Sequence, residues 1–214
     1  MVEPPDNWTQ TPSNNSLLHT GEGIVIDIGT GDGLFVYQCA RMNPNKFYIG
    51  IDANIRPLEK ISEKIHRKPA KGGAENVLFL HASVEDLPEE LTGVADEVHI
   101  HFPWGSLLRG VTVGEEAVLS SIRRVCSTDA LLEITIALDT ERDVSEIDRL
   151  ELPALSPDYI KSDLTNRYRN AGFEIVESGE SEPTNWKQLQ TSWARRLSGN
   201  PNRSLIYLIA KAID

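Results

Sequence analysis

Short apolar runs alternate along this chain with stretches whose apolar residues recur every three or four positions. The runs are rich in Val, Ile, Leu and Phe, as expected of buried strands. We predict strands at residues 25–28, 47–51, 77–80, 97–102, 131–138, 173–176 and 205–210. The amphipathic stretches predict helices at residues 34–40, 57–67, 115–125 and 160–171. This alternation predicts an α/β, Rossmann-like fold with a seven-stranded, mostly parallel sheet, the last strand antiparallel and helices on both faces.

The two ends of the chain differ from this pattern. Residues 1–21 are rich in Pro, Asn, Ser and Thr with little apolar periodicity, which predicts a polar N-terminal leader. Residues 22–214 form one predicted domain, with an acidic insertion of about 25 residues after residue 138. A further helix is predicted between Thr184, which resembles an N-cap, and the stop signal at residues 198–201.

Composition narrows the class of protein. A length of 214 residues with 40% hydrophobic content suffices for one α/β domain with a buried core. No apolar run approaches the roughly 18 residues of a membrane span, and the N-terminus lacks a secretory signal pattern, so we expect a cytoplasmic protein without membrane contact. Cys39 and Cys126 form no C-x-x-C pair and no histidine cluster is present, so neither a disulfide framework nor a metal site is expected.

The charge of the chain gives two opposing indications. A formal net charge of −11 argues against general affinity for nucleic acids, because phosphate contacts need clustered cations. The cations are nevertheless clustered: residues 60–71 hold five against one acid, and residues 183–213 hold five against none. Such asymmetry is expected of a one-faced RNA contact, but solvated helix faces produce similar runs, so both interpretations stay open on charge alone.

A glycine-rich turn, DIGTGDG at residues 27–33, follows the first predicted strand. Glycines at every second position let a flat ligand lie against the backbone. In the dinucleotide fingerprint the third glycine comes three residues after the second, whereas here it comes two after. The pattern D-x-G-x-G-x-G resembles motif I of the class I S-adenosylmethionine-dependent methyltransferases; a tight turn in any doubly wound sheet is the alternative. The resemblance implies S-adenosyl-L-methionine as cofactor, bound by Asp27, Gly29, Thr30, Gly31, Asp32 and Gly33.

A second acid supports this interpretation. Asp52 ends the second predicted strand and lies 21 residues after Gly31, close to the roughly 20-residue offset at which a βαβ unit presents an acid to a ribose. The resemblance implies that Asp52 binds the ribose hydroxyls of the cofactor. It further implies that Ser83 and Glu85, which follow the third predicted strand, contact its adenine.

The fourth predicted strand ends in Phe102, Pro103 and Trp104. Methyltransferases of this class that modify exocyclic amines carry an Asn-Pro-Pro-Tyr-like motif here, whose ring stacks on the target base. In this chain no acid or amide precedes the proline to accept a proton. We infer a ring-nitrogen target, which already presents a lone pair, held by stacking on Trp104 beside Pro103 and methylated mainly through positioning.

Trp193 is a second candidate for stacking. It shares an apolar stripe with Trp186, Leu189 and Leu197, and this pattern by itself favours a position in the core. The helix precedes the last strand, however, and therefore lies near the cofactor edge of the predicted sheet, with arginines around it.

Four separated motifs carry a closer resemblance: IDIGTGDG at residues 26–33, KPAKGG at 68–73, FPWGSLL at 102–108 and SWARRL at 192–197. Together they resemble the aminoglycoside-resistance methyltransferases that modify N1 of adenine 1408 in 16S rRNA. The resemblance covers about residues 22–210 and implies that a flipped adenine lies between Trp104 and Trp193. It implies the 30S ribosomal subunit as partner of this chain, which we expect to be monomeric. The implied RNA-binding residues are Arg67, Lys68, Lys71, Arg196 and Arg203.

Two other functions stay open. A tRNA guanine-N7 methyltransferase also targets a ring nitrogen, but that family is expected to space its motif Phe-Pro-Asp-Pro-Trp, whereas Trp104 directly follows Pro103. The acidic composition is compatible with a non-catalytic, cofactor-binding relative that has lost its RNA partner. The presence of both tryptophans argues against that second alternative.

Overall fold

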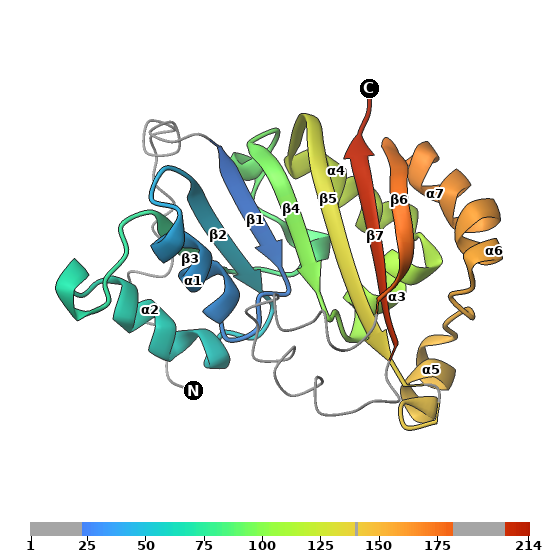
Figure 1. Ribbon diagram of the computed structural model, residues 1–214, viewed down its shortest axis with the longest axis horizontal. Helices are drawn as coiled ribbons and strands as arrows, with labels where there is room; N and C mark the ends of the chain where they lie inside the picture. The colour runs from blue at the N-terminus through green and yellow to red at the C-terminus, as the bar shows by residue number, and fades with distance from the viewer. Residues whose placement is uncertain (1–22, 140, 182–203) are drawn as a thin grey trace.

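The computed structural model describes residues 23–139, 141–181 and 204–214, and its centre is a seven-stranded sheet (Figure 1). The strand order is β3-β2-β1-β4-β5-β7-β6. β1 to β5 run parallel, and β7 pairs antiparallel with both β5 and β6, so the predicted fold class is confirmed. The strands are β1 Ile24–Ile28, β2 Phe47–Asp52, β3 Val77–His81, β4 Ala95–His101, β5 Cys126–Leu138, β6 Phe173–Ser181 and β7 Ser204–Ala212.

Helices cover the two faces of the sheet in separate groups. α1 (Leu34–Met42) and α2 (Glu59–Ile65) lie over β1, β2 and β3 on one face, as Figure 1 shows. α3 (Gly105–Val113), α4 (Glu116–Val125) and α7 (Thr165–Asn170) pack on the other face. Between β5 and α7 come α5 (Val144–Leu150), α6 (Pro157–Tyr159) and the π-helical η7 (Ile160–Leu164). Short 3-10 turns complete the described part: η3 Arg56–Leu58, η4 Pro69–Lys71, η5 Val84–Asp86 and η6 Glu89–Leu91.

Because successive side chains of a strand point to opposite faces of the sheet, each strand contributes to two separate cores. Ile24, Ile26 and Ile28 of β1 belong to the larger core beneath α3 and α4. Val25, between them, belongs to the smaller core beneath α1 and α2. Side chains of a strand point to opposite faces in turn, so a strand with helices on both sides is apolar throughout.

The sequence prediction missed α3, because it placed a single helix at residues 115–125 between the fourth and fifth strands. The structure has two helices there, which meet at Gly114 in the left-handed region at φ 72°. A glycine inside α3 weakened the helical signal, since glycine is a poor helix former. A Cβ at Gly110 would lie 2.7 Å from the Val118 side chain, so this glycine lets α3 and α4 approach closely.

Other boundaries also differ from the prediction. The fifth strand starts at Cys126 rather than at residue 131, directly after α4, and the sixth continues to Ser181 rather than ending at 176. The acidic insertion contains α5, and helical structure resumes at Pro157. The predicted leader and the helix that carries Trp193 lie outside the described residues. No described helix has the length and apolar character needed to cross a membrane.

Candidate active site

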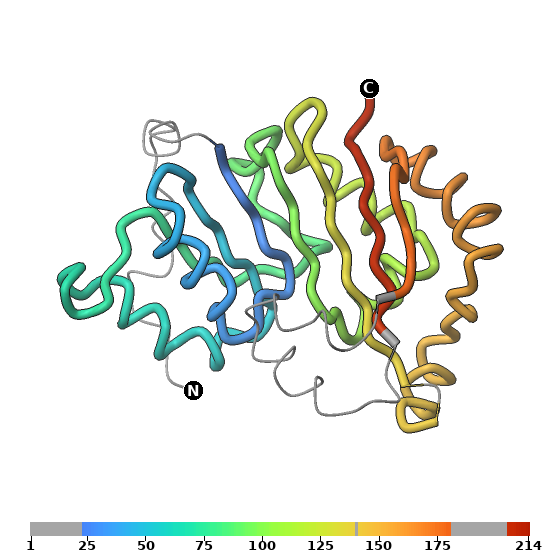
Figure 2. The backbone as a smooth tube through the Cα atoms, in the orientation of Figure 1, coloured from blue at the N-terminus to red at the C-terminus, as the bar shows by residue number. Residues whose placement is uncertain are grey.

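A cavity of about 540 Å³ lies at the carboxyl ends of the parallel strands. These ends lie at the lower edge of the sheet in Figure 2, where the chain leaves β1, β4 and β5. The strand order reverses between β1 and β4, which is the switch point where open α/β sheets bind ligands. The wall is formed by Ile28, Gly29, Gly31, Asp52, Ala53, Ala82, Ser83, Val84, Glu85, Phe102, Pro103, Trp104, Ser106, Leu107, Ala137 and Asp143.

The glycine turn forms the part of the wall that follows β1. The backbone N–H groups of Gly29 and Thr30 both donate to the Ile51 carbonyl, at 2.8 and 3.0 Å, which fixes the turn against β2. Gly31 has a φ of 61°, and a Cβ there would have no heavy atom within 4 Å. Position 31 therefore favours glycine because of its left-handed backbone conformation and not because of crowding by neighbours. The absence of a side chain leaves open space on the cavity side.

Asp52 contacts this turn from the end of β2. One carboxylate oxygen accepts the Gly31 N–H at 2.7 Å, and the other accepts the Asn54 N–H at 2.7 Å. The two bonds orient the carboxylate at the cavity wall. An acceptor in this position suits a vicinal diol such as that of a ribose.

Glu85 and two serines form the side of the cavity beyond β3. Ser83 and Glu85 come from the segment after β3, while Ser106 comes from the first turn of α3. Partial burial acts to raise the pKa of Glu85, but hydrogen bonds from its own backbone N–H and from Ser83 and Ser106 outweigh this, so the net shift is downward. The carboxylate is therefore charged at neutral pH and available to accept a hydrogen bond from an amino group.

The chain leaving β4 presents Trp104 at the edge of the cavity. Phe102 adopts a φ of 53°, rare for a bulky residue, while its N–H donates to the Thr135 carbonyl of β5 at 2.8 Å. Such a conformation costs on the order of 1–3 kcal/mol and persists only where surrounding contacts hold it. Pro103 is buried, whereas the side chain of Trp104 is 53% exposed. An indole with half its surface in water beside a cavity is free to stack on a ligand.

Seven of the predicted cofactor-binding and catalytic residues meet in this one cavity. They are Gly29, Gly31, Asp52, Ser83, Glu85, Pro103 and Trp104. Asp27, Thr30 and Gly33 are instead buried within the glycine turn and do not line the cavity, and Asp32 is exposed. The Asp32 carboxylate accepts the Leu34 N–H at 3.2 Å, at the start of α1. The roles of these four residues in cofactor binding stay predictions.

The cavity also contains residues that the sequence prediction missed. Leu107 lies against the glycine turn, since a Cβ at Gly29 would come within 2.9 Å of it. Ala137 and Asp143 flank the end of β5. A position at the end of a parallel strand or shortly after it was the available signal for these residues, but it does not say which side chains turn inward.

The basic loop after α2 is well supported by its neighbours. Arg67, Lys68 and Lys71 are all exposed around η4. From α1, the Tyr37 hydroxyl donates to the Gly72 carbonyl at 2.9 Å, and Arg41 donates to the carbonyls of Pro69 and Gly73, both at 3.1 Å. The loop therefore presents its cations on a defined backbone. Trp193, Arg196 and Arg203 lie outside the described residues.

The glycine turn after β1, the acid that ends β2 and the cavity at the switch point together define a class I S-adenosylmethionine-dependent methyltransferase. The family model described as NpmA: 16S rRNA (adenine(1408)-N(1))-methyltransferase matches residues 9–212. The chain belongs to this family.

Individual relatives agree with this assignment. The 16S rRNA (adenine(1408)-N(1))-methyltransferase of Streptoalloteichus tenebrarius is 40% identical over 183 residues, 85% of this chain and 83% of that protein. The crystal structure of the aminoglycoside resistance methyltransferase NpmB1 is 42% identical with a TM-score of 0.81, over 92% of this chain and 91% of that one. A third relative is a mutant of the Catenulisporales acidiphilia 16S rRNA (adenine(1408)-N(1))-methyltransferase, whose crystal structure contains the cosubstrate SAM. It is 33% identical with a TM-score of 0.84, over 100% of this chain and 93% of that one. The predicted family, enzyme class and cofactor are confirmed.

Proposed function

We propose that this chain transfers a methyl group from S-adenosylmethionine to N1 of adenine 1408 in 16S rRNA and so confers aminoglycoside resistance. The observation that carries the proposal is Trp104, half exposed on a strained backbone segment at the edge of the cofactor cavity. Pro103 precedes it directly, within the FPWGSLL segment that carries the resemblance to the family.

Stacking supplies the energy for taking the adenine out of the RNA helix. Extrusion of a base costs a few kcal/mol, and each aromatic face in contact with a base offsets roughly 1–3 kcal/mol. In the proposal Trp104 provides one face and Trp193 the other. A purine held in this way presents its Watson–Crick edge, including N1, to the cofactor.

The chemistry needs no general base. N1 of adenine carries an in-plane lone pair, which attacks the methyl carbon as the bond from that carbon to the cofactor sulfur breaks. The product adenine is cationic, and aromatic faces on both sides favour the charge that develops. The segment before Pro103 is consistent with this, because Phe102 offers no side-chain acceptor there.

We further propose that the substrate is the assembled 30S subunit and that a monomer acts on it in the cytoplasm. Exposed cations on the fixed η4 loop would contact phosphates of folded rRNA through Arg67, Lys68 and Lys71. Arg196 and Arg203 are proposed to extend this contact. An otherwise acidic surface would then limit binding to RNA that fits this face.

Transfer of labelled methyl groups from S-adenosylmethionine tests this function. Purified chain is incubated separately with 30S subunits, 50S subunits, deproteinised 16S rRNA and bulk tRNA. We expect label in 30S alone or in 30S far above free 16S rRNA. Label in tRNA would support the guanine-N7 alternative, and no label in any RNA would support a non-catalytic cofactor-binding protein.

A further inference from the structure

A row of ionisable side chains crosses the sheet behind the glycine turn. Asp27 of β1 pairs in register with His99 of β4, and His99 pairs with Glu133 of β5. We call these three residues the ionic row. Because neighbours in register point to the same face of a sheet, all three lie on the face that α1 covers. The Phe35 ring of α1 packs edge-on against the His99 ring, and the two ring centroids are 5.5 Å apart.

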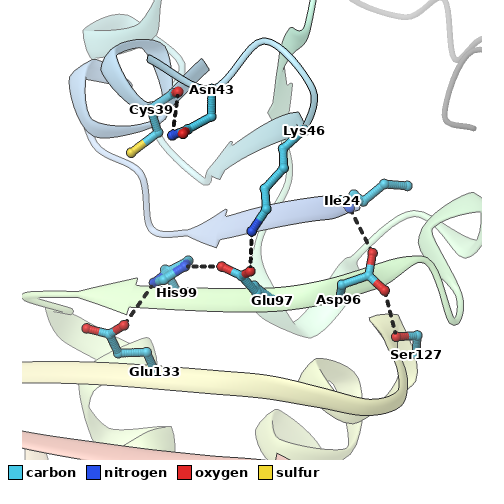
Figure 3. A network of polar contacts seen from close by, with 9 residues as sticks. All are labelled: Ile24, Cys39, Asn43, Lys46, Asp96, Glu97, His99, Ser127 and Glu133. Carbon is cyan, nitrogen blue, oxygen red and sulfur yellow. Dashed lines mark hydrogen bonds and ion pairs between the residues drawn. The ribbon is translucent and has the colours of Figure 1, made fainter. Parts of the chain in front are cut away.

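His99 lies between two carboxylates, as Figure 3 shows. Its Nδ1 is 3.5 Å from a Glu133 oxygen and its Nε2 is 3.6 Å from a Glu97 oxygen. Lys46 reaches the other oxygen of Glu97 at 2.5 Å. Burial lowers the pKa of His99, but Glu133 and Glu97 together outweigh it and raise the pKa to about 9. His99 is therefore an imidazolium at neutral pH.

Asp27 at the end of the row has an unsatisfied oxygen. Its side chain is buried, and Oδ1 has no hydrogen-bond partner among the described residues. Burial raises the pKa of Asp27 to about 6, while the side chain of Thr30 and the positive charge of His99 limit the rise. The titratable groups that act on Asp27 are His99 from β4, Asp52 from β2 and Cys39 from α1. Glu97, His101 and Glu133 surround His99 instead.

Of these neighbours, only His99 carries a positive charge. His101 is neutral, because burial and the nearby charge of His99 lower its pKa to about 3. Burial raises the pKa of the Cys39 thiol to about 11, so it is neutral as well. Together with the side chain of Thr30, the positive charge of His99 therefore favours the ionised form of Asp27 against the effect of burial.

We propose that His99 is a positioning residue for the cofactor: its imidazolium, held by Glu97 and Glu133, keeps Asp27 ionised behind the glycine turn. This inference rests on the proposed role of Asp27 in cofactor binding. The methionine end of S-adenosylmethionine carries a sulfonium and an ammonium group. Asp27 does not line the cavity, so its carboxylate would favour both positive charges through space, from behind the cavity wall. Without the imidazolium, Asp27 takes up a proton and must release it before the cationic cofactor binds.

Calorimetry of S-adenosylmethionine binding at pH 6, 7 and 8 tests the proposal. The ammonium group of the cofactor titrates in the same way for every variant, so each affinity is compared with that of wild type at the same pH. Relative to wild type, His99→Gln should lose progressively more affinity from pH 8 to pH 6, with proton release on binding at pH 7. Asp27→Asn should bind weakly at every pH without proton release. His66→Gln, at an exposed histidine after α2, is the matched control and should match wild type.

Two results would overturn the proposal. One is a His99→Gln protein whose affinity falls by the same factor at all three pH values with no proton release, since this indicates a merely structural role. The other is a neutral His99 ring at pH 7.5 in wild-type protein, detected by the imidazole nitrogen shifts of ¹⁵N-histidine-labelled chain, which needs no variant to fold. The methylation assay with 30S subunits tests a different claim. A chain that shows the expected pH dependence of cofactor binding but does not methylate 30S would refute the proposed function and leave the role of His99 standing.

Discussion

At the scale of single residues, the backbone on each side of Trp104 decides where its ring lies. Phe102 before it and Gly105 after it both have positive φ, at 53° and 60°. Gly105 adopts this conformation without strain, whereas Phe102 needs the bond to β5 to hold it. The segment thus directs an indole away from the core, where a tryptophan otherwise contributes more to stability.

Replacing Trp104 should separate catalysis from stability. We expect Trp104→Ala to reduce the rate of 30S methylation by about tenfold or more, because one stacking face of roughly 1–3 kcal/mol is lost. Trp104→Phe should retain most of that rate. A side chain that is 53% exposed contributes little to the core, so thermal melting should detect a loss of about 1 kcal/mol or less. An alanine variant with wild-type methylation would exclude Trp104 from the target site.

Asp52 should matter for the cofactor alone. Asp52→Asn keeps an acceptor oxygen but removes the charge, and it should weaken binding of S-adenosylmethionine by about tenfold, the 1.5–3 kcal/mol range of charge-assisted hydrogen bonds. Asp52→Ala should weaken it further and also release the Gly31 N–H. Calorimetry measures both constants. Unchanged affinity in the alanine variant would remove Asp52 from the cofactor site.

At the scale of elements, periodicity predicted the strands and most helices because burial imposes it directly. The seven strands lie where apolar runs predicted them, and the three motifs after β1, β2 and β4 converge on one cavity. α3 was missed because it contains Gly110, which weakens the helical pattern. That glycine is needed for close packing against Val118 of α4, a contact that cannot be seen in the local sequence. The ionic row was missed for a similar reason: register between distant strands joins Asp27, His99 and Glu133.

The η4 loop offers a test of how an element presents its cations. Tyr37→Phe removes the hydroxyl that bonds the Gly72 carbonyl, a bond worth about 1 kcal/mol. We expect affinity for 30S to fall by two- to fivefold while cofactor affinity stays constant. Tyr159→Phe is the matched control, since it removes the same kind of bond, to the Thr112 carbonyl, on the opposite face. Equal loss of 30S affinity in both variants would mean that general stability, not the loop, is responsible.

At the scale of the whole molecule, charge is segregated rather than balanced. The net charge of −11 coexists with a cationic loop on the face of α1 and α2. Long-range attraction to RNA is therefore weak, and binding depends on local contacts between cations and phosphates.

Salt dependence of 30S binding tests this segregation. Lys71→Glu should weaken binding of 30S subunits. It should also reduce the slope of log affinity against log salt concentration by about one, which corresponds to the loss of one phosphate contact. Lys161→Glu changes the net charge equally but lies in η7, on the opposite side of the sheet, and should have little effect. Filter binding across a salt series measures both slopes. Identical behaviour of the two variants would show that only total charge matters.

The central claim is that this chain methylates the ring nitrogen N1 of adenine 1408. The most direct measurement is mass spectrometry of nucleosides from the 1408 fragment, isolated from 30S subunits treated with the chain and S-adenosylmethionine. Standards of 1-methyladenosine and N6-methyladenosine distinguish the two positions by retention time. We predict 1-methyladenosine at position 1408 and unmodified adenosine in untreated subunits. N6-methyladenosine at that position, or 1-methyladenosine elsewhere with 1408 unmodified, would contradict the claim.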